Sequence, residues 1–193
     1  MMIKLMIMIS SLLIFPIALA QVSSDMSIYG RLSELGKSDL STFYQAINDS
    51  GFIDTLKSSC PITIFAPSNE AFAKISSKEL NEIMENRERL KSIIAYHIVP
   101  EDISSYELKN RLLMKTYQGE DLTISTSGDT IKVNNATIKQ SDIKCNNGVI
   151  HIIDTLLIPK ESQINGTLKK CGVVTMNNNG IIAIVNHNTT KSD

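Results

Sequence analysis

Three histidines are the side chains of this sequence best suited to acid–base chemistry, because an imidazole titrates near neutral pH. His97 follows Tyr96 directly, His151 lies three residues before Asp154, and His187 lies near the C-terminus. A strand would place His151 and Asp154 on opposite faces, so these two residues cannot form a local acid–base pair. The sequence also has no Gly-x-Ser-x-Gly elbow that would supply an activated serine. We therefore expect no enzymatic activity, and we expect structural roles for His151 and Asp154.

Tyr96 and His97 lie in the run YHIVP, residues 96–100, which has the composition of a short strand closed by proline. In a strand these two side chains would point to opposite faces. One interpretation is that one of them fills the core while the other hydrogen-bonds backbone groups at the edge of a sheet. The other interpretation is an exposed recognition patch, and a structural pair could also shape such a patch.

Three cysteines could form at most one intramolecular disulfide. No two of the cysteines form a Cys-x-x-Cys pair, since they lie at positions 60, 145 and 171. We therefore expect no zinc site and no other metal. A bond between Cys145 and Cys171 would close a loop of about 26 residues and stabilise the chain by about 3–4 kcal/mol. Cys60 with Cys145 is the alternative pairing. The third thiol would then be buried, or it would be available to link two chains.

The first twenty residues form a separate unit. Lys4 is their only charge, and their apolar stretch ends in ALA at residues 18–20. This pattern is typical of a cleaved signal peptide, so we expect a secreted or periplasmic protein without stable membrane insertion. The full chain carries a net charge of −1, and the mature chain has one positive charge fewer. Near neutrality argues against nucleic acid as a partner.

The elements that would position these residues follow from apolar spacing. Helices are expected at 38–50, at 52–56, over about 15 residues from Ser76, and more weakly at 104–112. Strands are expected at 62–65, 96–100, 122–126, 130–133, 136–139 and 149–153. The short strands and tight turns after residue 114 indicate a meandering sheet.

Residues 62–72 read ITIFAPSNEAF, in which a β-branched run changes abruptly to a helical pattern. Pro67 would end the strand. Ser68 or Asn69 would cap the following helix by accepting a hydrogen bond from one of its first N–H groups. Gly148 would lie in the turn before the last core strand. We expect structural roles for all four residues.

Three segments together resemble one family. Residues 62–72, and residues 147–154 with the sequence NGVIHIID, are similar to the two signature segments of the fasciclin domain, and YHIVP is similar to its central Tyr-His segment. Their order and spacing also agree. The resemblance covers residues 28–159. It leaves 21–27 as an N-terminal linker and 160–193 as a C-terminal extension with an expected hairpin at 173–185.

The resemblance implies an α+β fold, a fasciclin-like β-sandwich wedge with helices packed on one edge. It also implies an extracellular interaction module without catalytic chemistry or a cofactor. In animal members, integrin binding is ascribed to the Tyr-His segment and to Asp-Ile motifs. The matching residues of this chain are Tyr96, His97, Ile98, Asp142 and Ile143.

Our leading hypothesis is an exported, non-enzymatic adhesion module that binds a protein or glycan on a cell surface or matrix, as a monomer or a disulfide-linked dimer. One alternative is a carrier of a lipophilic small ligand, which needs an unfilled apolar groove. Another is a disulfide-linked structural protein of the cell envelope. Glu101 replaces a glycine that is usual in the family, and Ser141 replaces an acidic residue or proline, so no particular receptor is implied.

Overall fold

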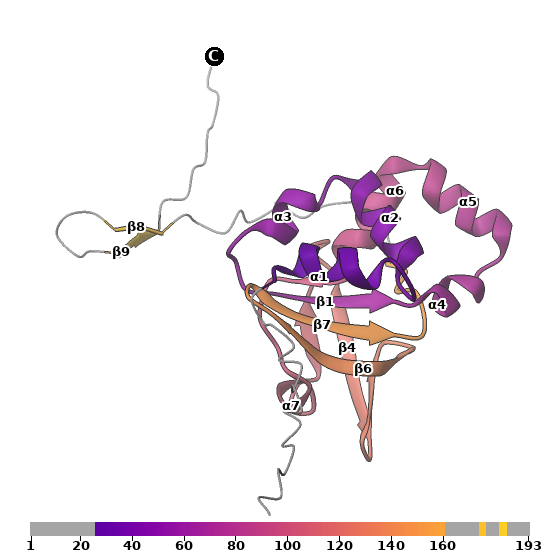
Figure 1. Ribbon diagram of the computed structural model, residues 1–193. Helices are drawn as coiled ribbons and strands as arrows, with labels where there is room; N and C mark the ends of the chain where they lie inside the picture. Colours follow the sequence, from indigo (N-terminus) through magenta and orange to yellow (C-terminus); the bar gives the residue numbers. More distant parts are fainter. Residues whose placement is uncertain (1–25, 161–173, 177–181, 185–193) are drawn as a thin grey trace, which may run out of the picture.

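The computed structural model describes residues 26–160 and the backbone of residues 174–176 and 182–184 (Figure 1). The expected signal peptide, most of the linker and most of the C-terminal extension lie outside these ranges, so the domain boundaries stay predictions. Cys171 and His187 also lie outside them. Within the described ranges, no helix is long and apolar enough to cross a membrane.

The described residues form short helices and a mixed sheet. The helices are α1 (Ile28–Leu35), α2 (Ser41–Ser50), α3 (Ile53–Lys57), α4 (Asn69–Ala73), α5 (Ser77–Glu85), α6 (Arg87–Tyr96) and α7 (Ser105–Leu108). The strands of the sheet are β1 (Ile62–Pro67), β2 (Ile98–Val99), β3 (Leu113–Lys115), β4 (Asp121–Ser127), β5 (Thr130–Val133), β6 (Ala136–Cys145) and β7 (Gly148–Ile153). A separate antiparallel pair, β8 (Val174–Met176) and β9 (Ile182–Ile184), falls where the hairpin is expected.

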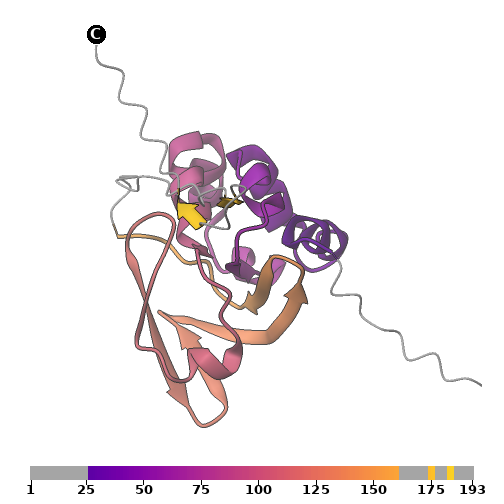
Figure 2. The ribbon, with the colours of Figure 1, turned by 90° about the vertical axis from the view of Figure 1, so that its left-hand side faces the viewer.

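The sheet has the strand order β2-β1-β7-β6-β5-β4-β3, and α1 to α6 lie together over its β1–β7 end (Figure 1). Figure 2 shows the later strands extending away from this helical layer. The two ends of the strand order approach each other where the Tyr117 N–H donates to the Ile98 carbonyl at 2.8 Å. The expected α+β wedge, with its helices on one edge, is therefore confirmed.

Two clusters of buried apolar side chains lie on opposite faces of β1. Ile62, Ile64 and Ala66 belong to the cluster that contacts the helices, whereas Phe65 belongs to the cluster enclosed by the curved sheet. Every residue of β1 and β7 is buried. Burial on both faces explains why these strands read as nearly continuous apolar runs rather than as an alternating pattern.

The parallel pairing of β1 with β7 begins with a close backbone contact. Gly148 lies opposite Ile62 and has a φ of +141°. A Cβ at Gly148 would lie 1.8 Å from the Ile62 carbonyl oxygen. Glycine is required here both for the backbone angle and for the approach of the two strands.

Asn147, directly before this contact, ties three segments together. Its Oδ1 accepts from the Ile28 N–H at 2.8 Å, and its Nδ2 donates to the carbonyls of Leu56 and Ser58 at 2.9 and 2.7 Å. The side chain is buried, and all of these bonds join residues far apart in sequence. The sequence indicates only a turn at this position, whereas the amide fixes α1 and the end of α3 to the start of β7.

The long helix expected from Ser76 is two helices. Asn86 ends α5 and caps α6, because its Oδ1 accepts from the Arg89 N–H at 3.0 Å. The apolar spacing continues across this break, so periodicity alone does not reveal it. The strand expected at 96–100 is also shorter, since Tyr96 ends α6 and His97 is its C-cap.

Ser68 and Asn69 both act as caps, each for a different helix. The Ser68 hydroxyl accepts from the Ala71 N–H at 3.3 Å and caps α4. Asn69 Oδ1 accepts from the Thr42 N–H at 3.2 Å, and its Nδ2 donates to the Ser38 carbonyl at 2.9 Å. Asn69 therefore holds the first turn of α2 against the end of β1, a contact that sequence spacing does not predict.

Gly148→Ala is expected to cost more than about 3 kcal/mol of unfolding free energy, because a methyl group cannot fit against the Ile62 carbonyl. The matched control is Gly128→Ala, which has a φ of +58° but nothing within 4 Å of the added Cβ. The control should cost only about 1–2 kcal/mol, the ordinary penalty of a left-handed backbone. Urea unfolding of both variants measures the difference, and equal costs would contradict the close contact.

Candidate partner-binding surface

The Tyr-His segment is buried. Tyr96, His97 and Ile98 expose 4%, 0% and 1% of their surfaces. The Tyr96 hydroxyl donates to the Asp121 carbonyl at 3.2 Å and accepts from Asn134 Nδ2 at 3.0 Å. Of the two interpretations of this segment, the exposed recognition patch is wrong, because Tyr96 is buried and ties the end of α6 to the start of β4 and to the turn after β5.

His97 joins α6 to the chain that follows β7. Its Nδ1–H donates to the Ile93 carbonyl at 2.8 Å, and its Nε2 accepts from the Leu157 N–H at 3.1 Å. Its ring also lies 5.7 Å from that of Phe43. Complete burial lowers the pKa of His97 to about 4, and the bond to the Ile93 carbonyl only partly opposes this shift. The imidazole is therefore neutral near pH 7.

Asp142 holds the first turn of α7. It has a φ of +60° and lies where the register of β6 shifts between Gln140 and Ile143. Its carboxylate accepts from the Ser105 N–H at 2.8 Å and from the Ser105 hydroxyl. Burial raises the pKa of Asp142, but the bonds from Ser105, together with His151 and Ser141, outweigh this effect and hold the pKa below its ordinary value. Ile143 is partly buried and packs against the helix-side core.

His151 completes this region without forming a catalytic triad. Its Nε2–H donates to the Ile103 carbonyl at 2.9 Å, and its Nδ1 accepts from the backbone N–H of Asp142 at 3.2 Å. The ring stacks on Phe65 at 5.6 Å. Burial lowers the pKa of His151. The Ser105 hydroxyl donates to the Asp142 carboxylate, whereas both ring nitrogens of His151 bond to backbone groups, so these residues do not form the Ser–His–Asp order of a hydrolase triad.

Thr63 adds a third buried polar contact beneath α7. Its hydroxyl donates to the Glu101 carbonyl at 2.6 Å and accepts from the Ile103 N–H at 2.9 Å. Together with His151 and Asp142, it fixes residues 101–105 to the sheet. Of the polar side chains on which the sequence resemblance placed partner binding, Asp142 therefore positions a different segment, the one that contains α7.

That segment carries most of the exposed bulky apolar residues in the described part of the chain. Tyr106, Leu112 and Leu113 expose 77%, 78% and 59% of their surfaces, and Ile158 exposes 41%. The first three lie between the start of α7 and the start of β3. We refer to these three side chains and the outer edge of β3 as the α7–β3 surface. Sequence reasoning missed it because exposure depends on packing.

The outer edge of β3 has unpaired backbone groups. The Ile124 N–H donates to the Leu112 carbonyl at 2.8 Å, which places residue 112 in a hydrogen-bonded pair with β4. Such pairs alternate along antiparallel strands, so the N–H and C=O of Leu113 and Lys115 point away from β4. Neither residue has a backbone partner on that side among the described residues.

Strands β2 and β3 lie at the two ends of the strand order. We call the gap between them the seam, and contacts join its two sides at both ends but not along its length. Tyr117 donates to the Ile98 carbonyl at one end. At the other, the Arg111 guanidinium forms an ion pair with Glu101 at 2.7 Å, which joins the chain before β3 to the chain after β2. These two contacts hold the edge of β3 in a fixed position.

Asp154 and Pro67 both make contacts that support the fold. Asp154 Oδ1 accepts from the Thr137 N–H at 2.8 Å, and Oδ2 lies 3.6 and 3.8 Å from the ammonium groups of Lys74 and Lys139. Burial raises the pKa of Asp154, but the bonds from Thr137 and Thr155 and the two lysines together lower it further than burial raises it. Pro67 is buried at the end of β1, opposite Ile153.

Cys145 carries a free thiol, so the two disulfide pairings expected from the sequence, both of which include it, are not formed. Its Sγ lies at the end of β6 and contacts the Ile143 carbonyl at 3.8 Å. Burial raises the pKa of Cys145 to about 11. The described residues contain no group of three or more His, Cys, Asp or Glu side chains placed to hold a metal ion.

The neutral, buried state of His97 predicts a pH-dependent stability. Between its unfolded pKa of 6.5 and its native value of about 4, the unfolded chain binds a proton that the native chain does not. Stability from this group is complete above pH 6.5 and is lost as the pH falls towards 4, by at most about 3 kcal/mol. Urea unfolding at a series of pH values in this range measures the free energy of unfolding. Its dependence on pH should be shallower in His97→Gln than in the wild type. An identical slope in both proteins would assign the proton uptake to other groups.

Asp142→Ala should cost about 2–3 kcal/mol, because it removes both bonds to Ser105 and leaves alanine in a left-handed conformation. Asp142→Asn should cost less, since asparagine tolerates that conformation and keeps an acceptor. Amide hydrogen exchange at Ser105, together with urea unfolding, measures both effects. Unchanged exchange at Ser105 in the alanine variant would show that α7 is held by other contacts.

Comparison with known proteins places this geometry in a family. The fasciclin domain family matches residues 38–159. Protein sll1483 of Synechocystis is 32% identical over 126 residues, which make up 64% of this chain and 69% of that protein. Human periostin is 35% identical over 126 residues, 65% of this chain but only 15% of periostin. Immunogenic protein MPB70 of Mycobacterium bovis is 33% identical over 107 residues, 55% of this chain and 54% of MPB70.

A solved structure has the same fold. It is a fasciclin domain pair from the insect cell adhesion molecule fasciclin I, which superposes with a TM-score of 0.56 at 19% identity and covers 71% of this chain and 52% of that one. The family match spans the helical layer from α2 onward and the whole seven-stranded sheet. This chain belongs to the fasciclin domain family.

Proposed function

We propose that this protein is an exported, non-enzymatic adhesion or interaction module, and that it binds a protein on a cell surface or matrix through the α7–β3 surface. The observation that carries the proposal is the exposure of Tyr106, Leu112 and Leu113 beside an unpaired strand edge. Exposed apolar residues that gather in one segment are typical of interaction sites. The similarity to a domain pair from a cell adhesion molecule supports this class of function.

The residues of the Tyr-His and Asp-Ile motifs act in this proposal as a scaffold. Tyr96 ties the end of α6 to the start of β4, and His97 joins α6 to residue 157, whereas Ile98 lies in the helix-side core. Asp142 fixes α7, and Ile143 packs against the helix-side core. Their substitution would alter partner binding by displacing α7 and β3 rather than by removing a direct contact.

A protein suits this surface better than a glycan. Two leucines offer apolar area without the flat aromatic faces that sugars stack on, and Tyr106 is the one aromatic side chain of the three. The outward N–H and C=O groups of Leu113 and Lys115 could pair with an extended segment of a partner, as sheet edges do in peptide recognition. The basic side chains nearby are partly neutralised, for example by the 3.3 Å ion pair of Lys109 with Asp129.

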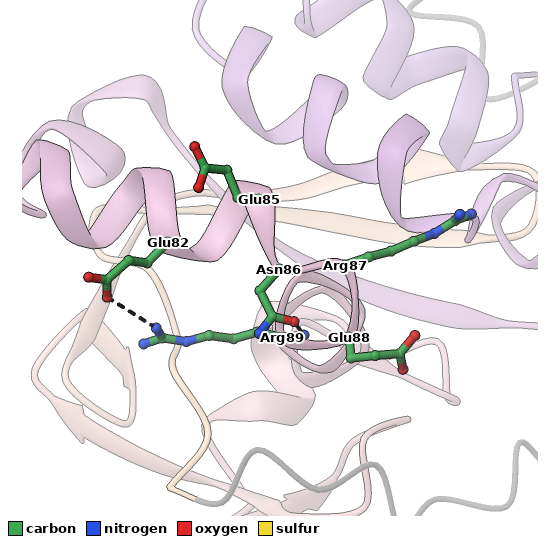
Figure 3. A pocket seen from close by; sticks show the side chains of 6 residues that line it. All are labelled: Glu82, Glu85, Asn86, Arg87, Glu88 and Arg89. Atoms are coloured by element: carbon green, nitrogen blue, oxygen red, sulfur yellow. Dashed lines mark hydrogen bonds and ion pairs between the residues drawn. The ribbon is translucent and has the colours of Figure 1, made fainter.

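A lipophilic carrier finds less support in the described surface. One hollow of about 670 Å³ lies at the junction of α5 and α6 (Figure 3). It is lined by Glu82, Glu85, Asn86, Arg87, Glu88 and Arg89. Such a lining of charged and amide groups does not suit an apolar ligand, because their desolvation would be costly.

The proposal includes a disulfide between Cys60 and Cys171, which would tie the C-terminal extension to the domain. It is supported by the bonded state of Cys60 and by the free thiol of Cys145. The pairing would leave no exposed, low-pKa thiol for a disulfide-linked dimer, since burial raises the pKa of Cys145. Secretion or periplasmic export would supply the oxidising environment that the bond needs.

The double substitution Leu112→Ser/Leu113→Ser should reduce cell attachment to surfaces coated with residues 21–193 at least tenfold, because it removes the exposed apolar contacts. The control is Ile158→Ser, which removes an exposed apolar side chain outside the α7–β3 surface. Thermal unfolding of each variant confirms that it is folded.

Three outcomes of this experiment can be told apart. Loss of attachment in the double variant alone supports the α7–β3 surface. Equal attachment by wild type and a folded double variant shows that this surface is not the binding site. Failure of wild-type protein to attach cells or to capture any protein from their surface extracts rejects the adhesion function itself.

A further inference from the structure

A second, smaller hollow lies between α6 and the chain that follows β7. Its volume is about 170 Å³, and it is lined by Arg89, Ser92, Ile93, Ile158, Pro159 and Lys160. We propose that this hollow binds a small organic anion with a short apolar body, of the class of a short-chain carboxylate. The site is separate from the α7–β3 surface and does not depend on the adhesion function.

The buried wall of the hollow carries a hydroxyl without a partner. Ser92 exposes 1% of its surface, and its Oγ has no hydrogen-bond partner among the residues that the structure describes. Buried polar side-chain atoms are nearly always hydrogen-bonded, so this hydroxyl needs an explanation. Because Ser92 lines the hollow, an acceptor placed inside it is the group that would complete the bond.

Two cationic side chains flank this hydroxyl. Arg89 lies 3.9 Å from Glu79 and 3.8 Å from Glu82, separations too long for charge-assisted hydrogen bonds, so its N–H donors remain available. The Lys160 ammonium has no ion pair within the described residues, although its backbone N–H donates to Glu120 Oε2 at 3.2 Å. The three carboxylates in this neighbourhood do not line the hollow, whereas both cations do.

The remaining walls are apolar and fixed. Ile158 exposes 41% of its surface, so a bound apolar group would cover area that is now in contact with water. The Leu157 N–H donates to His97 Nε2, which holds this wall against α6. A volume equal to about six water molecules limits the ligand to a few carbons and one charged group.

Pentanoate is a suitable probe for the mature chain, residues 21–193. Titration followed by ¹H–¹⁵N NMR should give saturable shifts at residues 92, 93, 158 and 160, with a Kd in the millimolar range. Pentan-1-ol, which has the same apolar body without the charge, should bind at least fivefold more weakly. Pentylammonium should not bind, because it places a cation beside Arg89 and Lys160.

The variants separate a binding site from a packing feature. Lys160→Gln should weaken pentanoate binding at least fivefold, while Lys91→Gln, which changes a lysine of α6 outside the hollow, should leave it unchanged. Ser92→Ala should weaken binding but should leave thermal stability equal or higher, since it removes an unpaired buried hydroxyl.

The proposal is overturned by any of three results. The first is the absence of saturable shifts at about 50 mM pentanoate, a concentration that exceeds a millimolar Kd tenfold or more. The second is equal affinity for pentanoate and pentan-1-ol. The third is unchanged affinity for pentanoate in folded Lys160→Gln and Ser92→Ala variants.

Discussion

The parallel pairing of β1 with β7 is the contact on which the other parts of the fold depend. Six register pairs join these strands, and every residue of both is buried. Gly148 permits the approach at the start of the pairing, and Asn147 ties α1 and α3 to the same point. The helical layer packs on one face and the curled remainder of the sheet on the other, so both hydrophobic clusters share this pair of strands.

The polar side chains next to this pair position loops. His97 links α6 to residue 157, while Thr63, His151 and Asp142 hold residues 101–105. Each bonds mainly to backbone groups of a segment distant in sequence. Loss of one partner would leave a buried donor or acceptor unsatisfied, which is more costly than the net gain from forming the bond. This cost explains why residues with catalytic potential have structural roles in this fold.

The same contacts decide which segment of the domain is exposed. The Tyr-His segment is buried, with the Tyr96 hydroxyl bonded at the start of β4 and at the turn after β5, and the carboxylate of Asp142 accepts from Ser105. What these residues leave exposed is α7 and the edge of β3, held at the seam by Arg111 and Glu101. A rigid edge with apolar side chains loses little conformational entropy on binding, which favours recognition by an interaction module.

The sequence by itself determined the family, the α+β class and most strands, because the signature segments and the β-branched runs are local patterns. It also indicated a helix cap at Ser68 or Asn69 and a turn at Gly148, whereas the requirement for glycine there comes from the contact with Ile62. Tertiary structure decided the rest. The break at Asn86, the helical end at Tyr96, the free Cys145 and the bonds of Asn147 and Asn69 depend on partners distant in sequence. The packing of the helical layer and the curled sheet on β1 and β7 leaves Tyr106, Leu112 and Leu113 exposed. The same packing buries Tyr96 and His97. Local sequence spacing does not reveal this packing.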